Sequence, residues 1–423
     1  MDFVSHLRSY LSEEEINKLL DSFNESDKHA CLLNPQKMDD ATFLSLFPHV
    51  IKHPFVKHAY IYDKNEYPLG KTVYHDLGCF YLQEPSAMLP TFFLNPSKDD
   101  LVLDLCAAPG GKTIQASFLM ENEGTIIAND LSHSRVNAIL ENVERLGLGN
   151  VVITNNDFSK IYKNYQNYFD KIILDAPCSG SGMFRKDDKM KDDWSYQKVL
   201  KNQEIQKELI LIAYSMLKEG GLMVYSTCSY SKEEDEDVIQ YLLDNTDASI
   251  MDIEDSPLLY KNPKQPLGVH LFPHMFLGEG HYICLIKKPG NLVKRKQDPK
   301  PIKSDLYIDE RIKSLYKFGD TLFGLTHEEI PLKGLNIIRL GVKIGEYKGK
   351  EFRYDYHYSH FIKDYPYKQI LTDEDYQRYI QGYELNSQSN STYIILIYIN
   401  NIVNFAKSTG GKLKNYYPKR LRY

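Results

Sequence analysis

Short apolar runs alternate with longer amphipathic stretches through the middle of the chain. Six of these runs have the length and the β-branched content of buried strands, at residues 101–105, 125–128, 151–154, 171–174, 222–226 and 282–286. Stretches with helical periodicity follow most of them. Strands that alternate with helices are typical of a parallel sheet covered by helices on both faces. The pattern therefore predicts a doubly wound α/β domain over residues 100–289.

The two flanking regions carry different patterns. Residues 1–99 mix helical signals with short strands, and Ser12 followed by Glu15 predicts the capped start of a helix. Residues 290–303 are basic and contain prolines but no periodicity, which indicates a linker. Beyond this linker, residues 304–423 contain strand-like runs at 335–340 and 393–399. Because 423 residues exceed one ordinary core, we expect three domains, with a small α/β domain first.

Composition and charge exclude several classes of protein. No run of 18 apolar residues is present, so we expect neither a spanning helix nor a membrane partner. The start of the chain lacks a signal-peptide pattern, and the six cysteines include no CxxC pair. We therefore expect reduced thiols, no metal and a cytoplasmic monomer. A net charge of -6 restricts any RNA contact to local basic patches.

A glycine-containing turn at residues 103–113 (LDLCAAPGGKT) follows the first predicted strand and precedes a helical stretch. A P-loop is excluded because Cys106 stands where its first glycine is required, and the GxGxxG pattern is also absent. S-adenosylmethionine is then the nucleoside cofactor that this fold commonly binds. Asp130, at the end of the second strand, could accept hydrogen bonds from ribose or could cap the next helix. Asp157 follows the third strand and is placed to meet the adenine.

Two cysteines directly follow predicted strands. Cys178 lies in the segment DAPCSGSG (175–182), and Cys228 lies in the segment YSTCS (225–229). Ligands of open α/β sheets bind outside the carboxyl ends of the strands, so both thiols should face the cofactor crevice. The other cysteines are expected to be small packing residues, which is the commoner role of a free cysteine: Cys31, Cys79, Cys106 and Cys284.

A pair of thiols suits the methylation of cytosine at carbon 5. That carbon is a weak nucleophile, and addition of a thiolate to carbon 6 makes it reactive. A carboxylic acid near ring nitrogen 3 would offset the developing charge, a role suited to Asp175. After methyl transfer the proton on carbon 5 must leave before the first thiolate can be expelled. A second thiol can take that proton.

At these residues the chain resembles the NOP/Sun family of RNA cytosine carbon-5 methyltransferases. The resemblance spans about residues 30–288 and includes the segments 81–88, 104–113, 175–182, 226–229, 272–274 and 278–281. It implies that Cys228 is the nucleophile and that Cys178 assists release of the product. It also implies a site for S-adenosylmethionine on a Rossmann-like class I sheet. The residues implied to line that site are Cys106, Ala107, Ala108, Pro109, Gly110, Gly111, Lys112, Asp130, Arg135, Asp157 and Asp175.

Two segments depart from the usual family pattern. His270 stands where the family usually has arginine. Residues 28–34 (KHACLLN) lack the usual arginine before the asparagine. Both departures concern contacts to RNA or cofactor and leave the expected chemistry unchanged.

The third region is similar to the C-terminal extension of the bacterial ribosomal-RNA branch of this family, which has a PUA-like α+β fold. Its final residues, 401–423, contain no acidic residue, and tyrosines lie between the cations. Composition alone favours a solvated charged terminus, whereas the resemblance implies contact with RNA phosphates and bases. The implied RNA-binding residues are Lys412, Lys414, Lys419, Arg420 and Arg422.

The expected function is S-adenosylmethionine-dependent methylation of cytosine carbon 5 in RNA. The expected partner is 16S ribosomal RNA or the small ribosomal subunit. Methylation of transfer RNA is the alternative within the same class of enzyme. A ribosome-assembly factor that binds RNA without catalysis is the alternative from another class, and the presence of both cysteines and the cofactor acids disfavours it.

Overall fold

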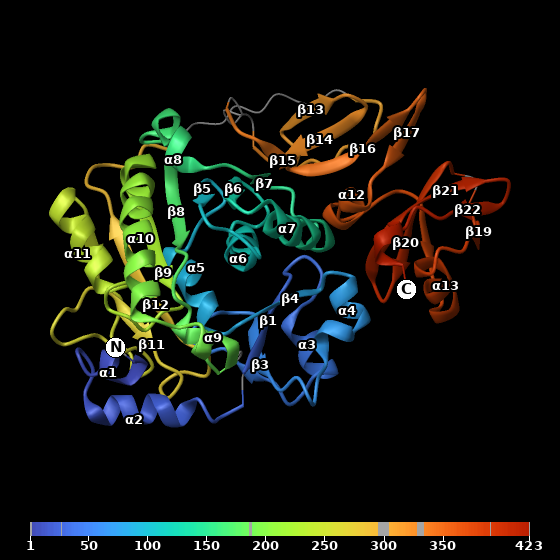
Figure 1. Ribbon diagram of the computed structural model, residues 1–423. Coiled ribbons are helices and arrows are strands. Elements are labelled where there is room, and N and C mark those ends of the chain that lie inside the picture. The colour runs from blue at the N-terminus through green and yellow to red at the C-terminus, as the bar shows by residue number, and fades with distance from the viewer. Residues whose placement is uncertain are drawn as a thin grey trace.

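The computed structural model describes residues 2–26, 28–185, 188–294, 304–327, 334–389 and 391–422. Within these ranges, a mixed sheet of nine strands forms the centre of the molecule (Figure 1). Its strands follow in the spatial order β10 (Ser249–Met251), β12 (His281–Lys287), β9 (Leu217–Thr227), β8 (Phe169–Asp175), β5 (Leu101–Asp104), β6 (Thr125–Asn129), β7 (Val151–Thr154) and β15 (Ile337–Leu340), with β11 (Val269–Leu271) paired to β12. The six apolar runs predicted from the sequence all form strands of this sheet.

The strand directions correct one detail of the parallel prediction. Strands β5 to β9 are parallel to one another. Strand β12 runs antiparallel to β9, with Tyr282 opposite Thr227, and β15 runs antiparallel to β7. The chain reaches β12 from β11 through a loop, and such a connection joins antiparallel strands without a crossover helix. The α/β fold class is confirmed, and the sheet is mixed rather than wholly parallel.

Helices cover both faces of the central sheet. Leu103 and Ile172 face a layer formed by α8 (Phe158–Ile161), α10 (Tyr196–Met216) and α11 (Glu236–Asn245). Val102 and Ile173 face the opposite layer, formed by α5 (Leu89–Leu94), α6 (Gly111–Leu119) and α7 (His133–Leu146). Burial on both faces explains why these strands read as continuous apolar runs. None of the helices in the described ranges is long and apolar enough to cross a membrane.

The N-terminal region consists of two helices and a small sheet. Helices α1 (Phe3–Leu7) and α2 (Glu13–Ser22) pack against Tyr230 and Phe272 of the central region. Ser12 accepts a hydrogen bond from the Glu15 amide at 3.2 Å, as the sequence predicts for a capped helix. The elements that follow are an antiparallel sheet and its helices: β1 (His29–Leu33), β2 (Ile51–Lys52), β3 (Ala59–Tyr62), β4 (Phe80–Gln83), α3 (Asp40–Leu46) and α4 (Val73–Asp76).

The C-terminal region contains two further sheets. The first has the order β13 (Ser314–Phe318), β14 (Thr321–Leu325), β16 (Val342–Lys348) and β17 (Glu351–Tyr354). The second has the order β18 (Lys368–Ile370), β20 (Tyr393–Tyr398), β21 (Asn401–Thr409), β22 (Lys412–Lys414) and β19 (Leu385–Asn386). Helices α12 (Tyr356–Phe361) and α13 (Asp373–Ile380) accompany them.

The regions are joined more closely than the sequence boundaries indicate. Of the predicted linker, residues 295–303 lie outside the described residues. The run predicted at 335–340 forms β15, which pairs with β7 and completes the central sheet instead of the C-terminal region. Without β15, strand β7 would leave unpaired backbone groups at an open edge. A shared apolar cluster also joins Leu33 and Phe80 of the N-terminal sheet to Tyr356 and Tyr379 near the other end of the chain.

Helix α7 carries the main ionic contact between the central and C-terminal regions. The Glu144 carboxylate pairs with Arg339 of β15 through one oxygen and with Arg420 through the other. Glu144 and Arg339 are both buried. Removing one partner of a buried ion pair is strongly destabilising, because the other partner remains as an uncompensated buried charge.

We therefore expect Glu144→Ala to lower the free energy of unfolding by about 3–5 kcal/mol, because it strands the Arg339 guanidinium in the interface. Chemical denaturation measures this difference. The matched control is Glu141→Ala, which removes an exposed carboxylate 3.5 Å from Arg420 and should cost about 0–1 kcal/mol. Equal losses for the two variants would show that the buried pair does not hold the regions together.

Candidate active site

The turn after β5 brings backbone groups to the first turn of α6. Gly110 adopts a φ of 111°, a left-handed conformation that favours glycine. A side chain at Gly111 would meet the Gln83 amide nitrogen at 3.0 Å, so the turn and β4 approach closely. The free amides at the start of a helix favour a negatively charged group such as a carboxylate.

Asp104, at the end of β5, is a buried acid beneath this turn. One of its oxygens accepts a hydrogen bond from the Thr113 hydroxyl at 2.6 Å, and the other has no partner among the described residues. Burial raises the pKa of Asp104 to about 7. The turn therefore keeps unused hydrogen-bonding capacity next to its glycines.

Asp130 lies at the end of β6 and is buried against the same turn. Its carboxylate accepts hydrogen bonds from the Ala108 amide at 3.2 Å and the Ser132 amide at 2.9 Å. Arg135 donates to the Ala108 carbonyl at 2.6 Å and lies 3.6 Å from Asp130. Ser132, not Asp130, occupies the N-cap position of α7, which removes the capping alternative for Asp130. Each carboxylate oxygen keeps a further lone pair for a hydroxyl donor.

Asp157 has a different environment from the other predicted cofactor acids. It is the N-cap of α8, where it accepts hydrogen bonds from the Ser159 amide at 3.2 Å and the Ser159 hydroxyl at 2.6 Å. The Lys160 ammonium lies 3.0 Å away. The hydrogen bonds from Ser159 and Lys160 lower the pKa of Asp157. These contacts give it a structural role in α8, in addition to the predicted contact with adenine.

The two predicted site cysteines lie in contact. Strands β8 and β9 are parallel neighbours, with Asp175 opposite Ser226, and a cysteine follows each strand within three residues. The sulfur atoms of Cys178 and Cys228 are 3.3 Å apart, and both residues are partly exposed. The hydrogen bond to Cys228, together with burial, raises the pKa of the Cys178 thiol well above its usual range. Cys178 is therefore protonated and able to donate to the sulfur of Cys228.

Asp175 connects the cysteine loops, which are the segments that carry Cys178 and Cys228 after β8 and β9, to the cofactor turn, which is the glycine-containing turn at residues 103–113. Its carboxylate lies 2.7 Å from the Lys112 ammonium and 3.4 Å from His281 Nε2, and it accepts a hydrogen bond from the Ser226 hydroxyl at 2.8 Å. Burial opposes ionisation, but Lys112 and His281 outweigh it and hold the pKa of Asp175 well below its usual range. These contacts favour the ionised form of Asp175 in the protein without RNA, and its expected role beside the cytosine ring stays a prediction.

Sequence reasoning missed an acidic run, residues 233–237, that follows the Cys228 loop. Such a run is usually a solvated surface, yet Glu234, Asp235 and Glu236 are almost completely buried. Sequence reasoning also missed Arg185, whose guanidinium forms a buried bidentate pair with Glu279 at 3.0–3.2 Å. The available signal was position, since both groups lie within eight residues of a site cysteine.

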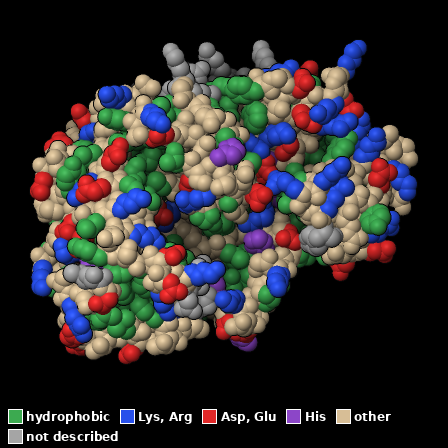
Figure 2. Space-filling view, viewed as in Figure 1, with side chains coloured by type: hydrophobic (Ala, Val, Ile, Leu, Met, Phe, Trp, Pro, Cys, Tyr) green, Lys and Arg blue, Asp and Glu red, His purple; other side chains and the backbone are tan. Residues whose placement is uncertain are grey.

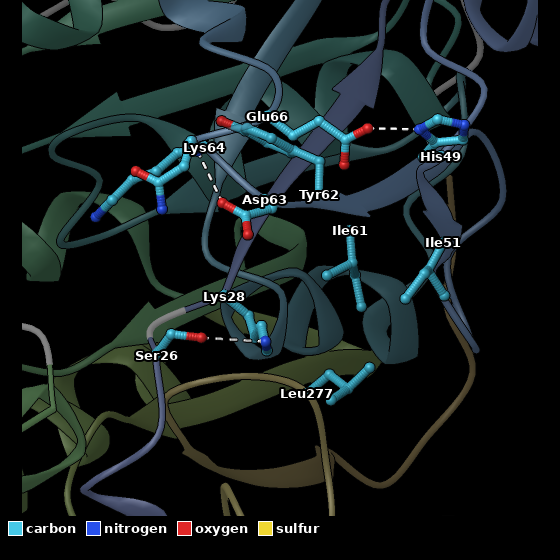
Figure 3. A pocket seen from close by; sticks show the side chains of 11 residues that line it. Ser26, Lys28, His49, Ile51, Ile61, Tyr62, Asp63, Lys64, Glu66 and Leu277 are labelled. Atoms are coloured by element: carbon cyan, nitrogen blue, oxygen red, sulfur yellow. Dashed lines mark hydrogen bonds and ion pairs between the residues drawn. The ribbon is translucent and has the colours of Figure 1, made fainter.

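Two cavities lie against the N-terminal sheet. One of about 160 Å³ reaches Gln83 and Glu84, and it shares Lys28 and Tyr62 with a second cavity of about 220 Å³. Figure 3 shows the second cavity, which has apolar and charged side chains around it. Neither cavity is lined by a residue of the cysteine loops or the glycine turn. Figure 2 shows the surface hollowed between the positions of α5, α6 and β1 in Figure 1.

The predicted RNA-binding residues of the tail separate into two groups. Lys412, Lys414 and Lys419 are exposed. Arg420 instead pairs with Glu141 and Glu144 of α7, and Arg422 donates to the Tyr417 carbonyl at 2.9 Å. The Arg420 guanidinium thus holds the tail against α7, whereas the Arg422 guanidinium bonds within the tail itself. Arg420 is exposed as well but pairs with the carboxylates of Glu141 and Glu144, so the three lysines are the exposed cations of the predicted set that pair with no carboxylate within the described residues.

The fold and the site together define a class of protein. A Rossmann-like sheet with a glycine turn after its first strand, an acid at the end of the next strand and two thiols at neighbouring strand ends is the arrangement of an S-adenosylmethionine-dependent methyltransferase. The comparisons with known proteins bear this out. Residues 91–287 match the family described as 16S rRNA methyltransferase RsmB/F, residues 1–85 match the N-terminal domain of 16S rRNA methyltransferase RsmF, and residues 369–423 match the RsmF PUA domain.

Curated relatives cover most of the chain. Ribosomal RNA small subunit methyltransferase F from Vibrio cholerae is 30% identical over 85% of this chain and 82% of its own length. The protein of the same name from Psychromonas ingrahamii is 32% identical over 84% and 81%, respectively. The chain therefore belongs to the RsmB/F family of 16S rRNA methyltransferases. This confirms the resemblance seen in the sequence, including its ribosomal-RNA branch and PUA-like region.

Solved structures agree with the fold. A methyltransferase homologue from Pyrococcus horikoshii is 28% identical, with a TM-score of 0.59 over 67% of this chain and 93% of that one. NSun6 from Pyrococcus horikoshii, solved with SFG, has a TM-score of 0.62 over 69% of this chain and 98% of that one. Its 21% identity shows the fold alone. S-adenosylmethionine is the cofactor of the family, and the unused oxygen of Asp104 and the lone pairs of Asp130 fit its ammonium and ribose hydroxyl donors.

Asp130→Ala should weaken the binding of S-adenosylmethionine by about 1.5–3 kcal/mol, the value of hydrogen bonds to a charged group. Calorimetric titration of the cofactor into the folded variant measures this loss. Asp157→Ala is the comparison variant. It removes a carboxylate that is already bound by Ser159 and Lys160 at the start of α8, whereas Asp130→Ala removes the acid predicted to bind ribose. If affinity is unchanged in Asp130→Ala and reduced only in Asp157→Ala, the ribose contact lies elsewhere.

Proposed function

We propose that this protein methylates carbon 5 of a cytosine in 16S ribosomal RNA through a covalent adduct to Cys228. The observation that carries the proposal is the 3.3 Å contact between Cys178 and Cys228, one strand end away from the cofactor turn. Two adjacent thiols exceed what packing needs, and they match a reaction in which one sulfur adds and another group removes a proton. The small ribosomal subunit is the proposed partner, and a cytoplasmic location follows from it.

In the first step, the Cys228 thiolate adds to carbon 6 of the cytosine, and the electron pair of the 5,6 double bond moves toward carbon 5. S-adenosylmethionine, when bound, supplies the methyl group that this carbon attacks. We propose that Asp175 accepts a hydrogen bond from the cytosine amino group, because Lys112 and His281 favour the ionised form of its carboxylate. The ionised acid therefore orients the ring by accepting a hydrogen bond.

In the second step, Cys178 first loses its own proton to solvent, and its thiolate then takes the proton from carbon 5. The 5,6 double bond re-forms, and Cys228 leaves as a thiolate. The proposed order follows from the cause of the raised pKa of Cys178, because its largest contribution comes from Cys228. Once Cys228 is bound to carbon 6 as a thioether, that contribution is removed. Cys178 then loses its own proton more readily, so that its thiolate is available when the proton on carbon 5 must leave.

We propose residues 1–99, 100–289 and 304–423 as the three domains. Strand β15 belongs to the third of these ranges but pairs with β7 of the central sheet. The exposed lysines of the tail are proposed to contact RNA phosphates: Lys412, Lys414 and Lys419. Arg135 and the backbone of residues 106–111 are proposed to complete the cofactor site with Asp130. Transfer-RNA methylation and RNA binding without catalysis are less well supported, since the curated relatives carry the name of a ribosomal-RNA enzyme.

The two thiols should fail in opposite ways when they are replaced. Cys228→Ala should neither methylate RNA nor form an adduct, because the ring is never activated. Cys178→Ala should add and methylate but release slowly, so that a protein–RNA complex accumulates in the presence of S-adenosylmethionine. Denaturing gel electrophoresis detects this complex.

The control for these variants is Cys284→Ala, which removes a buried thiol of β12 outside the site and should keep both steps. The complex formed by Cys178→Ala should disappear when Cys228 is also replaced. A trapped complex in Cys228→Ala, with none in Cys178→Ala, would exchange the two roles.

A further inference from the structure

Glu234 lies just before α11 and is completely buried. Its side chain accepts hydrogen bonds from the Ser179 amide at 2.7 Å, the Ser179 hydroxyl at 2.5 Å and the Ser229 hydroxyl at 2.6 Å. Gln206 of α10 adds a fourth donor at 3.3 Å. None of these donors belongs to α11. The Glu234 carboxylate therefore connects α10 and the two segments that follow β8 and β9.

The two serines occupy equivalent positions. Ser179 directly follows Cys178, and Ser229 directly follows Cys228. The two hydroxyl groups lie 3.3 Å apart, the same distance that separates the two sulfur atoms. One carboxylate oxygen thus receives both hydroxyls and ties together the residues next to each thiol.

The electrostatic environment shows that this carboxylate is not a simple packing group. Burial raises the pKa of Glu234, and the hydrogen bonds from Ser179 and Ser229 oppose that shift. A buried acid without such donors would cost several kcal/mol, and an apolar side chain would fill the same space at lower cost. The complete set of donors from both cysteine loops therefore indicates a positional role.

Neighbouring acids of the run have separate partners. Asp235 accepts a hydrogen bond from the Thr227 hydroxyl at 2.6 Å, and that hydroxyl in turn accepts one from the Ser229 amide at 3.0 Å. Glu233 points away from the cysteine loops and lies 3.2 Å from His6. Glu233 therefore provides a matched acid, adjacent in sequence, that does not contact either loop.

We propose that Glu234 is a positioning residue for methyl transfer that holds Cys178 and Cys228 in contact through Ser179 and Ser229. What the two thiols do chemically rests on the proposed function, whereas the spacing that Glu234 imposes does not. Loss of the carboxylate should let the two loops separate, because Ser179 and Ser229 lose their common acceptor.

Oxidation of the thiol pair measures this spacing without RNA or cofactor. Diamide takes up two electrons and two protons as two thiols form a disulfide, and peptide mapping identifies the Cys178–Cys228 product. The unmodified protein should form this disulfide rapidly. The rate for Glu234→Ala should be lower by a factor of about ten, because reaction between groups held in contact depends on their alignment. Glu233→Ala, the matched control, should match the unmodified protein.

Two further variants keep the test decisive if Glu234→Ala does not fold. Ser229→Ala removes only one donor and should also slow disulfide formation, while Glu234→Gln keeps one acceptor and should be intermediate between Glu234→Ala and the unmodified protein. In methylation assays Glu234→Gln should lower kcat and leave the KM for S-adenosylmethionine unchanged. Disulfide formation at the unmodified rate in folded Glu234→Ala and Ser229→Ala would overturn the proposal. If oxidation behaves as expected but cytosine is not methylated, the proposed function fails and the positioning role stands.

Discussion

The parallel pairing of β8 with β9 is the constraint on which the site depends. Because Asp175 lies opposite Ser226, the segments that follow the two strands leave the sheet side by side. Each segment then places a cysteine within three residues of its strand, and the sulfur atoms meet at 3.3 Å. A shift of one residue in this pairing would turn one of the thiols toward the opposite face. The adjacent β5 supplies the cofactor turn from the same edge of the sheet.

Electrostatic contacts refine what the sheet brings together. The backbone of Lys112 belongs to the glycine turn, and its ammonium group pairs with the Asp175 carboxylate. A single ion pair therefore links the predicted cofactor site to the loop that carries Cys178. Glu234 performs a corresponding task between the cysteine loops. Both contacts are buried or partly buried, where hydrogen bonds and charges act more strongly than in water. The family assignment and this arrangement agree, since methyl transfer to carbon requires a cofactor, a nucleophile and a base in one place.

The parts of the fold that could be predicted are those determined by local sequence. Strands buried on both faces read as apolar runs, which is why β5 to β9 were placed correctly. The direction of β12 could not be predicted, because an apolar run does not show whether the strand lies parallel or antiparallel to its neighbour. The place of β15 depends on a partner more than 180 residues away, and its run alone indicated only a strand.

The site shows the same division. The glycine turn, Asp130 and the two cysteines carry local signals, whereas the ionised state of Asp175 depends on Lys112 and His281 from other segments. Glu234 was missed because five consecutive acids resemble a solvated surface, and only the tertiary structure provides their partners. The pairing of Arg420 with Glu144 of α7 could not be predicted, because no local signal connects residues so far apart in the chain.

The proposed mechanism requires that Cys228 form a covalent bond to a cytosine of 16S ribosomal RNA. The most direct measurement uses 16S RNA transcribed with 5-fluorocytidine, because fluorine at carbon 5 cannot be removed as a proton and the adduct persists. After incubation with S-adenosylmethionine, digestion and mass spectrometry identify the modified peptide. We expect a methylated fluorocytosine attached to the peptide that contains Cys228, and no adduct with transfer RNA. An adduct on Cys178, or adducts formed only with transfer RNA, would contradict it.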